Sequence, residues 1–229
     1  MISRVRISLI ILAAIAFASF LVWLGLSMGF FNKLFGKKGN TGNTATSPIT
    51  GHREDWAAYL STIDNDKVGS ILVDLGLKAL APVSSKPRRL RVDVAMNYPS
   101  ENGLPTQSEF GSLNQIDEKL GDTLKSLGAV YAGHLYCQGT MSLYYYLGED
   151  AAFETALSGA MAVFPSYKYE YKLDKEPNWE SYAEVLYPLP IQMQSIHNQK
   201  VIDNLRNNGD KLDVKRPVDR MHVGDADPR

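Results

Sequence analysis

An uninterrupted run without any charged side chain, residues 7–31, constrains this chain more than any other feature of its sequence. At a rise of about 1.5 Å per residue, a helix over this run spans roughly 37 Å, whereas the hydrocarbon core of a bilayer is about 30 Å thick. Inside lipid every backbone polar group must be paired within the segment, and a helix meets that requirement. The run therefore predicts one transmembrane helix over residues 7–31, preceded by an N-terminal tail at residues 1–6.

The alternative interpretation of the same run is a cleaved secretory signal peptide. Arg4 and Arg6 would form its basic start, and Ala16-Phe17-Ala18 resembles a small-x-small cleavage site. Cleavage there would leave the apolar residues 20–31 at a new N-terminus with nothing to bury them, so the uncleaved anchor is favoured. The positive charges flanking the run are balanced, which means that the positive-inside rule does not decide the orientation of the helix.

The part of the chain beyond the anchor is acidic. Residues 32–50 have the small, polar composition of a flexible linker, and residues 51–190 are long enough for one domain with a core. Five of the 24 basic residues flank the anchor, which leaves 19 basic and 25 acidic residues beyond it, a net charge of −6. The one local basic cluster, residues 86–91, stands at the start of an expected strand, where charges usually solvate an edge. We therefore expect no direct contact with nucleic acid.

The order of the expected elements indicates the fold class. Alternating apolar residues predict strands, apolar residues at helical spacing predict helices, and Thr106 with Glu109 forms an expected capping box. The expected elements are a hairpin at residues 54–77, strands at 90–96, 129–137, 140–147 and 167–173, and helices at 106–128 and 149–165. This order predicts an α+β fold, a ferredoxin-like βαββαβ sandwich with an extra N-terminal β-hairpin.

Residues 191–229 form a separate C-terminal segment in this interpretation. A short helix around Trp179, Tyr182 and Leu186 is expected to end the main domain. A second helix from about Asn198 to Gly209 would turn an apolar stripe inward, formed by Val201, Ile202 and Leu205, and a strand at 211–223 would follow. These two elements are too few to bury a core of their own, so we expect the helix to dock near Trp179 and Leu186 and residues 219–229 to be frayed.

Two groups of residues suggest chemistry, and each has a simpler structural interpretation. The tyrosines at 144–146 and at 167, 169 and 171 suggest a platform for stacking nucleic-acid bases, but strands favour aromatic residues for packing alone. His134 and Cys137, the only cysteine, resemble half of a zinc site. Their odd spacing in a strand sends the two side chains to opposite faces, so we expect both to be structural.

The sequence nominates no catalytic, cofactor-binding or metal-binding residue. It contains no Gly-x-Ser-x-Gly elbow, no His-Glu-x-x-His motif and no dinucleotide-binding glycine pattern. The acidic residues lie where helix surfaces and caps are expected, and solvated roles are usual there. We therefore expect no cofactor, no metal and no small-molecule ligand.

Several short motifs of the main domain resemble the bacterial family called domain of unknown function 695. They are Glu54-Asp55-Trp56-x-x-Tyr59, Asn102-Gly103-Leu104-Pro105-Thr106, Ala129-Val130-Tyr131-x-Gly133, Trp179-x-x-Tyr182 and Leu186-Tyr187-Pro188. The resemblance spans about residues 54–188 and implies a bacterial, non-enzymatic domain. Relatives in the cytoplasm favour, slightly, a cytoplasmic position for the soluble part.

The C-terminal segment resembles the opening of a second family, the regulator of ribonuclease E activity B, a ribonuclease inhibitor with a ferredoxin-like fold. The similar residues are Asn198-x-x-Val201-Ile202-x-x-Leu205 and Gly209-Asp210-x-Leu212-x-x-x-Arg216-x-Val218-Asp219. That family continues into a strand and most of a domain, whereas this chain reads Arg220-Met221-His222 and ends at Arg229. We therefore expect residues 191–229 to be an incomplete regulator-like segment.

Taken together, the sequence favours a single-pass membrane protein that presents a non-catalytic binding or regulatory module. The bilayer would be one partner, through residues 7–31, and an unknown protein the other. The second resemblance suggests a ribonuclease as a class of partner. The alternative is an enzyme whose active site, within the α+β domain, matches no familiar motif.

Overall fold

A computed structural model of the chain describes residues 49–63 and 66–210, which belong to one compact unit that begins at Ser47. The predicted tail, transmembrane helix and most of the linker lie outside these residues, as does the strand predicted at 211–223. Within the described ranges, no helix is long and apolar enough to cross a membrane.

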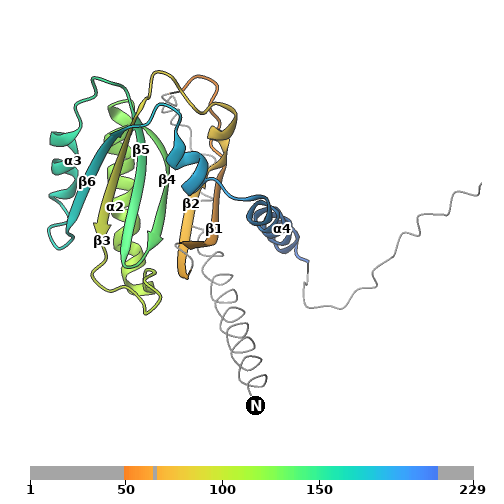
Figure 1. The fold of residues 1–229 in the computed structure, drawn as a ribbon. Helices are drawn as coiled ribbons and strands as arrows, with labels where there is room; N and C mark the ends of the chain where they lie inside the picture. Colours follow the sequence, from red (N-terminus) through yellow and green to blue (C-terminus); the bar gives the residue numbers. More distant parts are fainter. Residues whose placement is uncertain (1–48, 64–65, 211–229) are drawn as a thin grey trace, which may run out of the picture. The chain divides into compact units, whose positions relative to one another are not determined.

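The domain is an α+β structure built on one six-stranded antiparallel sheet (Figure 1). The strands lie in the order β1-β2-β4-β5-β3-β6. Their bounds are Trp56–Ile63 (β1), Lys67–Asp74 (β2), Arg88–Ala95 (β3), Val130–Cys137 (β4), Thr140–Leu147 (β5) and Tyr169–Lys175 (β6). One helix connects β3 to β4, and β5 lies between these two strands in the sheet. Another helix connects β5 to β6, and β3 lies between them. The predicted order of elements is confirmed, and the N-terminal hairpin extends the sheet beside β4.

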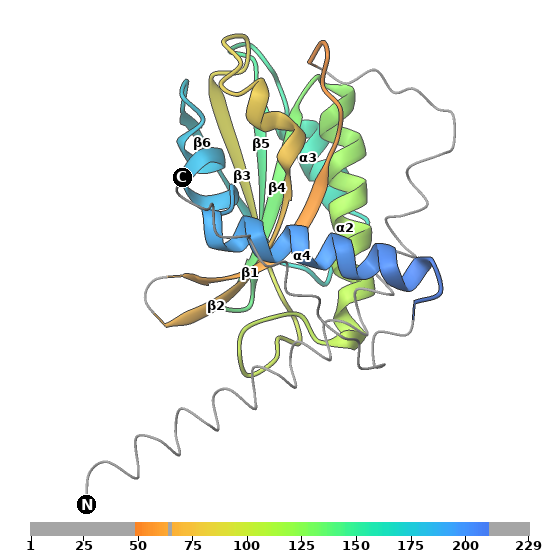
Figure 2. The ribbon, with the colours of Figure 1, turned by 90° about the vertical axis from the view of Figure 1, so that its right-hand side faces the viewer.

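Two helices cover one face of the sheet, α2 (Gln107–Ser126) and α3 (Glu154–Met161) (Figure 2). Apolar residues of α2 recur at helical spacing and are fully buried, namely Leu113, Ile116, Leu120 and Leu124. On the strand side, Leu90, Val92 and Val94 are fully buried at every second position of β3. The helix predicted to begin at 149 begins later, at Glu154, with Phe153 as its buried N-cap residue.

The capping box predicted at the start of α2 does not form. Thr106 is the N-cap residue, but its hydroxyl donates to the Tyr98 carbonyl oxygen (2.9 Å) instead of accepting from the helix. The buried Glu109 carboxylate accepts from the backbone N–H groups of Asn97 and Tyr98. Both side chains therefore anchor the loop after β3, a tertiary role that the local pattern did not indicate.

A second core covers part of the opposite face of the sheet. It contains the π-helical turn η3 (Ser181–Leu186), preceded by Trp179, and the 3-10 turn η2 (Leu75–Ala79). Trp179 stacks on Tyr146 of β5, with ring centroids 3.8 Å apart, and meets Tyr182 edge-on. Tyr144 and Tyr146 point into this core, whereas Tyr145 stacks on Tyr131. The run of tyrosines at 144–146 is therefore buried packing on both faces of the sheet, as the structural interpretation predicted.

The C-terminal helix differs from its prediction. α4 (Pro190–Asn207) begins eight residues before Asn198 and contacts β1, where Gln192 Nε2 donates to Ser61 Oγ (2.9 Å) and Lys200 pairs with Asp55 (2.9 Å). It therefore docks on the main domain, but along β1 rather than near Trp179. Of the predicted stripe, Val201 is 59% exposed and Leu205 37% exposed, so these residues do not face inward. The predicted stop at Gly209, with φ +79°, is confirmed.

Gly133 occupies a position of β4 that requires glycine. A bulge between Tyr131 and Gly133 shifts the register with β5, and Gly133 has φ +145°. A Cβ atom there would clash with the Leu72 carbonyl oxygen of β2. We expect Gly133→Ala to lower the free energy of unfolding by at least about 1–3 kcal/mol, the usual cost of a strained backbone, measured by urea denaturation.

Gly159→Ala in α3 is the matched control. Its Cβ would meet nothing within 4 Å, and alanine favours a helix over glycine by about 0.5–1 kcal/mol. We expect this variant to be stabilised. Equal effects of the two substitutions would contradict the special role of Gly133.

Candidate functional site

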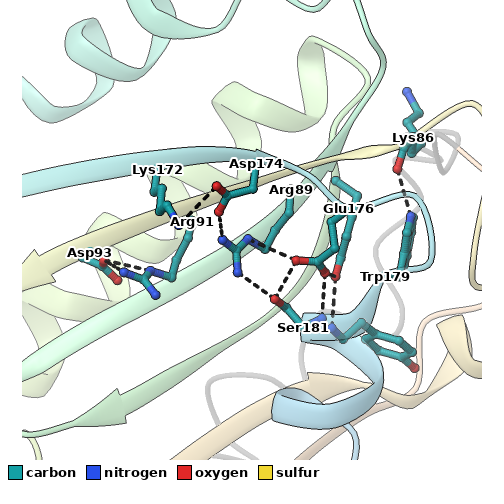
Figure 3. Close-up of polar contacts among 11 residues, drawn as sticks. Lys86, Arg89, Arg91, Asp93, Lys172, Asp174, Glu176, Trp179 and Ser181 are labelled. Carbon is teal, nitrogen blue, oxygen red and sulfur yellow. Dashed lines mark hydrogen bonds and ion pairs between the residues drawn. The ribbon is translucent and has the colours of Figure 1, made fainter.

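Charged side chains lie on the face of the sheet opposite α2 and α3, beside the core that contains Trp179. Arg89, Arg91 and Asp93 alternate with the buried apolar residues of β3, so they point away from α2 and α3. In register beside them on β6 lie Asp174, Lys172 and Glu170. We call these six side chains the charged face, and Figure 3 shows the part of it from Asp93 to Asp174. With three basic and three acidic groups, it has no net charge.

The basic cluster predicted at residues 86–91 is engaged inside the protein. Lys86 Nζ donates to the Gly128 carbonyl oxygen (2.6 Å), and Arg88 donates to two carbonyl oxygens, those of Gly148 and Ala151 (3.0 Å each). Arg91 pairs with Asp93 (2.8 Å) on its own strand. These side chains stabilise loops and neighbouring strands, so the cluster is not a concentrated surface for phosphate groups.

One end of the charged face is locked to η3 through Glu176, which follows β6. Its carboxylate accepts from the Tyr146 hydroxyl (2.7 Å), the Ser181 backbone N–H (2.7 Å) and the Ser181 hydroxyl (2.9 Å). Arg89 completes the network by donating to Ser181 Oγ (2.7 Å) and pairing with Asp174 and Glu176 (Figure 3). The Arg89 side chain is only 12% exposed. This end therefore has a structural role, because Arg89, Glu176 and Ser181 hold one another in place.

Within the charged face, Asp174 is a carboxylate whose pKa is lowered by its neighbours. Burial alone would raise its pKa, but hydrogen bonds and charges from Lys172 and Arg89 outweigh that effect and lower the pKa. Asp174 therefore stays ionised at neutral pH and holds Arg89 in place.

The other end of the charged face is more open and contains a shallow depression of about 220 Å³. Its lining residues are Asp93, Ala95, Thr140, Lys168, Tyr169 and Glu170. Asp93 is 9% exposed, and its Oδ1 atom has no hydrogen-bond partner among the described residues. Pockets for small ligands usually measure about 300–1,000 Å³ and are mostly apolar, so this depression suits one polar side chain of a partner better than a cofactor.

A second group of ionisable residues is buried between the sheet and α2. The Tyr131 hydroxyl lies 2.8 Å from His134 Nδ1, and Asp117 Oδ2 lies 3.6 Å from the same nitrogen. Asp117 and His134 are buried, and Asp117 Oδ1 and the Tyr136 and Tyr145 hydroxyls have no hydrogen-bond partner among the described residues. This interior polar cluster (residues 117, 131, 134, 136 and 145) gathers acid and base groups, although no single sequence motif connects them.

The tyrosines of the interior polar cluster resist ionisation. Burial, followed by the charge of Asp117, raises the pKa of Tyr131, Tyr136 and Tyr145 well above the usual value of about 10. A group whose pKa is raised by folding stabilises the protein below its unfolded pKa and loses that contribution as pH rises above it. The domain should therefore lose stability above about pH 10.

This pH dependence can be measured by alkaline unfolding. We expect tyrosinate absorbance from the buried tyrosines to appear together with the loss of circular dichroism, and not before it. Tyr145→Phe removes a hydroxyl without a described partner, so its alkaline midpoint should move to higher pH. Ionisation of all tyrosines while the circular dichroism is unchanged would contradict the burial of this cluster.

A buried histidine–aspartate pair lies at the end of the hairpin. His52 Nε2 lies 2.7 Å from Asp74 Oδ2, and Asp74 is fully buried. Asp74 Oδ1 also accepts from the backbone N–H groups of Asp55 and Gly76 (2.9 Å each). Burial raises the pKa of Asp74, and these contacts partly oppose that effect. The carboxylate acts as a cap for η2, which explains its position without a catalytic role.

His134 and Cys137 point to opposite faces of β4, as their spacing predicted. His134 belongs to the interior polar cluster, whereas Cys137 packs against the core that contains Trp179. Among residues 49–63 and 66–210, no group of three potential metal-binding side chains occurs. The charged face and the interior polar cluster were not identified from the sequence, because the members of the first come from two strands and those of the second from three separate elements.

The motif residues of the sequence meet around η3 and the hairpin. Tyr59 donates to the Leu186 carbonyl oxygen (2.9 Å), and Tyr182 donates to the Asp74 carbonyl oxygen (3.0 Å). The first bond joins the first motif to the last, and the second joins the Trp179-x-x-Tyr182 motif to the end of β2.

Comparison with known proteins agrees with the limits of this domain. A model of a family of unknown function, DUF695, matches residues 54–187, from just before β1 to just after η3. No curated protein and no solved structure matches the chain. Because the matched residues make up more than half of the sequence, the chain belongs to the DUF695 family.

Proposed function

We propose that the chain is a membrane-anchored module that binds a protein partner through the charged face and catalyses no reaction. The observation that carries this proposal is the mixed charge of a sheet surface whose open end, among the described residues, is a shallow depression beside the buried Asp93 carboxylate. Interspersed charges of both signs select partners by electrostatic complementarity, whereas a strongly basic surface would favour nucleic acid.

The anchor and the fold assignment are parts of this proposal. The uncharged run at residues 7–31 supports a single transmembrane helix, joined to the domain by the linker at 32–50. The order β4-β5-β3-β6, with antiparallel neighbours and helices in both crossovers, supports a ferredoxin-like unit over residues 88–175. We place this unit in the cytoplasm, and a ribonuclease is the class of partner suggested by the resemblance of residues 198–219 to a ribonuclease regulator.

A reporter fused after Arg229 tests the orientation. We expect an enzyme that is active only in the cytoplasm to work in this fusion. A reporter that works only outside the cytoplasm would overturn the orientation and would also exclude a ribonuclease partner there.

Site-specific photocrosslinking of the full chain in cells tests the partner surface. A crosslinking amino acid at Thr140, beside the depression, should capture one defined protein, whereas the same group at the exposed Lys119 of α2 should not. Glu170→Lys, which reverses a charge at the depression, should abolish the product at Thr140. Equal products at both positions, or an unchanged product with Glu170→Lys, would contradict binding through the charged face.

The alternative proposal is an enzyme whose active site includes the interior polar cluster. The observation that favours it is the convergence of Asp117, Tyr131 and His134, because perturbed ionisable groups gather at active sites. The same groups also suit a buried structural network. His134→Gln separates the two proposals, since an enzyme would lose its reaction while a binding module would keep the crosslink from Thr140.

A further inference from the structure

Within the part of the chain that the structure describes, β6 has no strand beside it on its outer side, and in this it differs from the opposite edge. α4 contacts β1 through Ser61, and it pairs with Asp55 just before this strand. β6 pairs with β3 on one side and is the last strand in the order on the other. Its side chains are accessible, with Tyr171 46% exposed and Tyr169 36% exposed. An open edge strand is a template for pairing with another strand.

The backbone of β6 presents alternate residues to this free edge. The Lys168 carbonyl oxygen accepts from Ala95 of β3, and the Glu176 backbone N–H donates to the Pro87 carbonyl oxygen. Even-numbered residues therefore direct their backbone groups toward β3. By the alternation of an antiparallel ladder, Tyr169, Tyr171 and Leu173 direct theirs outward.

Like charges face each other across β3 and β6, and only some of them are paired among the described residues, Arg91 with Asp93 and Lys172 with Asp174. Asp93 stands directly opposite Glu170, and Arg91 stands directly opposite Lys172. Like charges in facing positions of neighbouring strands destabilise a sheet. Lys168 and Glu170 form no ion pair with another described residue, so their charges are available to a neighbouring strand.

We propose that two copies of the chain pair through their β6 strands, antiparallel and symmetric about Tyr171. This register places Glu170 opposite Lys172 of the second copy and Lys168 opposite its Asp174, and the symmetry repeats both pairs. On the other face, Tyr169 meets Leu173 and Tyr171 meets itself. The acidic pair Asp93 and Glu170 then continues into the basic pair Lys172 and Arg91 of the second copy.

Neighbouring registers are less favourable. A two-fold axis at Lys172 would set Lys172 against itself and Glu170 against Asp174, while an axis at Glu170 would set Glu170 against itself and Lys168 against Lys172. An axis between two residues would oppose side chains from different faces of the sheet. The axis at Tyr171 also gives the charged pairs the non-hydrogen-bonded positions, where facing side chains are closest. Of these registers, the axis at Tyr171 is the one that sets opposite charges in facing positions.

Charge reversal with rescue tests the interface in the full chain in detergent micelles, with mass measured by analytical ultracentrifugation. We expect the wild-type protein to dimerise, and Glu170→Lys or Lys172→Glu alone to raise the dimer dissociation constant roughly ten- to hundredfold, because each change makes two attractive pairs repulsive. The double variant, Glu170→Lys with Lys172→Glu, should restore the dimer. A monomeric wild type, dimers unaffected by single reversals, or a double variant that stays monomeric would overturn the proposal.

Cysteine crosslinking tests the register independently of affinity and of any association between anchors. In a Cys137→Ser background, Tyr171→Cys should form a disulfide-linked dimer on mild oxidation, because facing Cα atoms of a hydrogen-bonded pair are about 5.5 Å apart. Tyr169→Cys lies on the same face, and the register sets it opposite Leu173, so it should not link to itself. Equal linkage at both positions, or linkage at neither, would overturn the register.

Discussion

Trp179→Ala should lower the free energy of unfolding by about 3–5 kcal/mol, the usual range for truncating a fully buried tryptophan. The ring is 0% exposed, stacks on Tyr146 and meets Tyr182 edge-on. Its Nε1 atom donates to the Lys86 carbonyl oxygen (2.9 Å), which ties η3 to the start of β3. Urea denaturation followed by near-UV circular dichroism measures the change.

Two variants make this result specific. Trp179→Phe keeps a ring on Tyr146 but loses the hydrogen bond to the Lys86 carbonyl oxygen. It should therefore lower the free energy of unfolding by about 1–2 kcal/mol. Val185→Ala lies on the same turn at 37% exposure and should change stability by less than about 1 kcal/mol. If Trp179→Ala costs no more than Val185→Ala, η3 is not held by the second core.

Arg89→Met should cost a similar amount, about 3–5 kcal/mol, because it removes the cation from a largely buried ion-pair network. Asp174 and Glu176 would then face each other's charge without Arg89, and Ser181 Oγ would lose a donor. Methionine keeps much of the side-chain volume, so the loss reports on charge rather than on a cavity.

Partial rescue is the test of that explanation. Adding Glu176→Gln to Arg89→Met removes one of the unpaired carboxylates and should recover part of the lost stability. Lys172→Met is the control on the same face, since the Lys172 side chain is 63% exposed and its partner, Asp174, stays paired with Arg89. It should cost at most about 1 kcal/mol. Equal costs for Arg89→Met and Lys172→Met would show that burial of the network contributes nothing.

The elements that depend on local periodicity were predicted well. α2 follows from apolar residues three and four positions apart, such as Leu113, Ile116 and Leu120, and β3 follows from strict alternation around Val92 and Val94. These patterns report which side of an element is buried, and burial is the main source of stability for each element. The odd spacing of His134 and Cys137 correctly separated them for the same reason.

Predictions that depended on a side chain's partner failed. Thr106 and Glu109 match a capping box, yet both bond to the loop after β3, because that loop passes close enough to compete with the helix end. α4 was expected to face inward at Val201 and Leu205, but these residues are exposed. Neither competitor is visible in a local window of sequence.

The sequence by itself determined the class of fold and the order of its elements, because each element carries its own pattern of apolar residues. The resemblance of its short motifs indicated the extent of the family domain. Only the tertiary structure decided which groups the charged side chains contact. Arg89 binds Asp174 and Glu176, Lys86 binds the Gly128 carbonyl oxygen, and the like charges of β3 and β6 are brought into register at an open edge. Electrostatic and hydrogen-bonding partners depend on distances of a few ångströms between residues far apart in the chain, and only the tertiary fold brings them together.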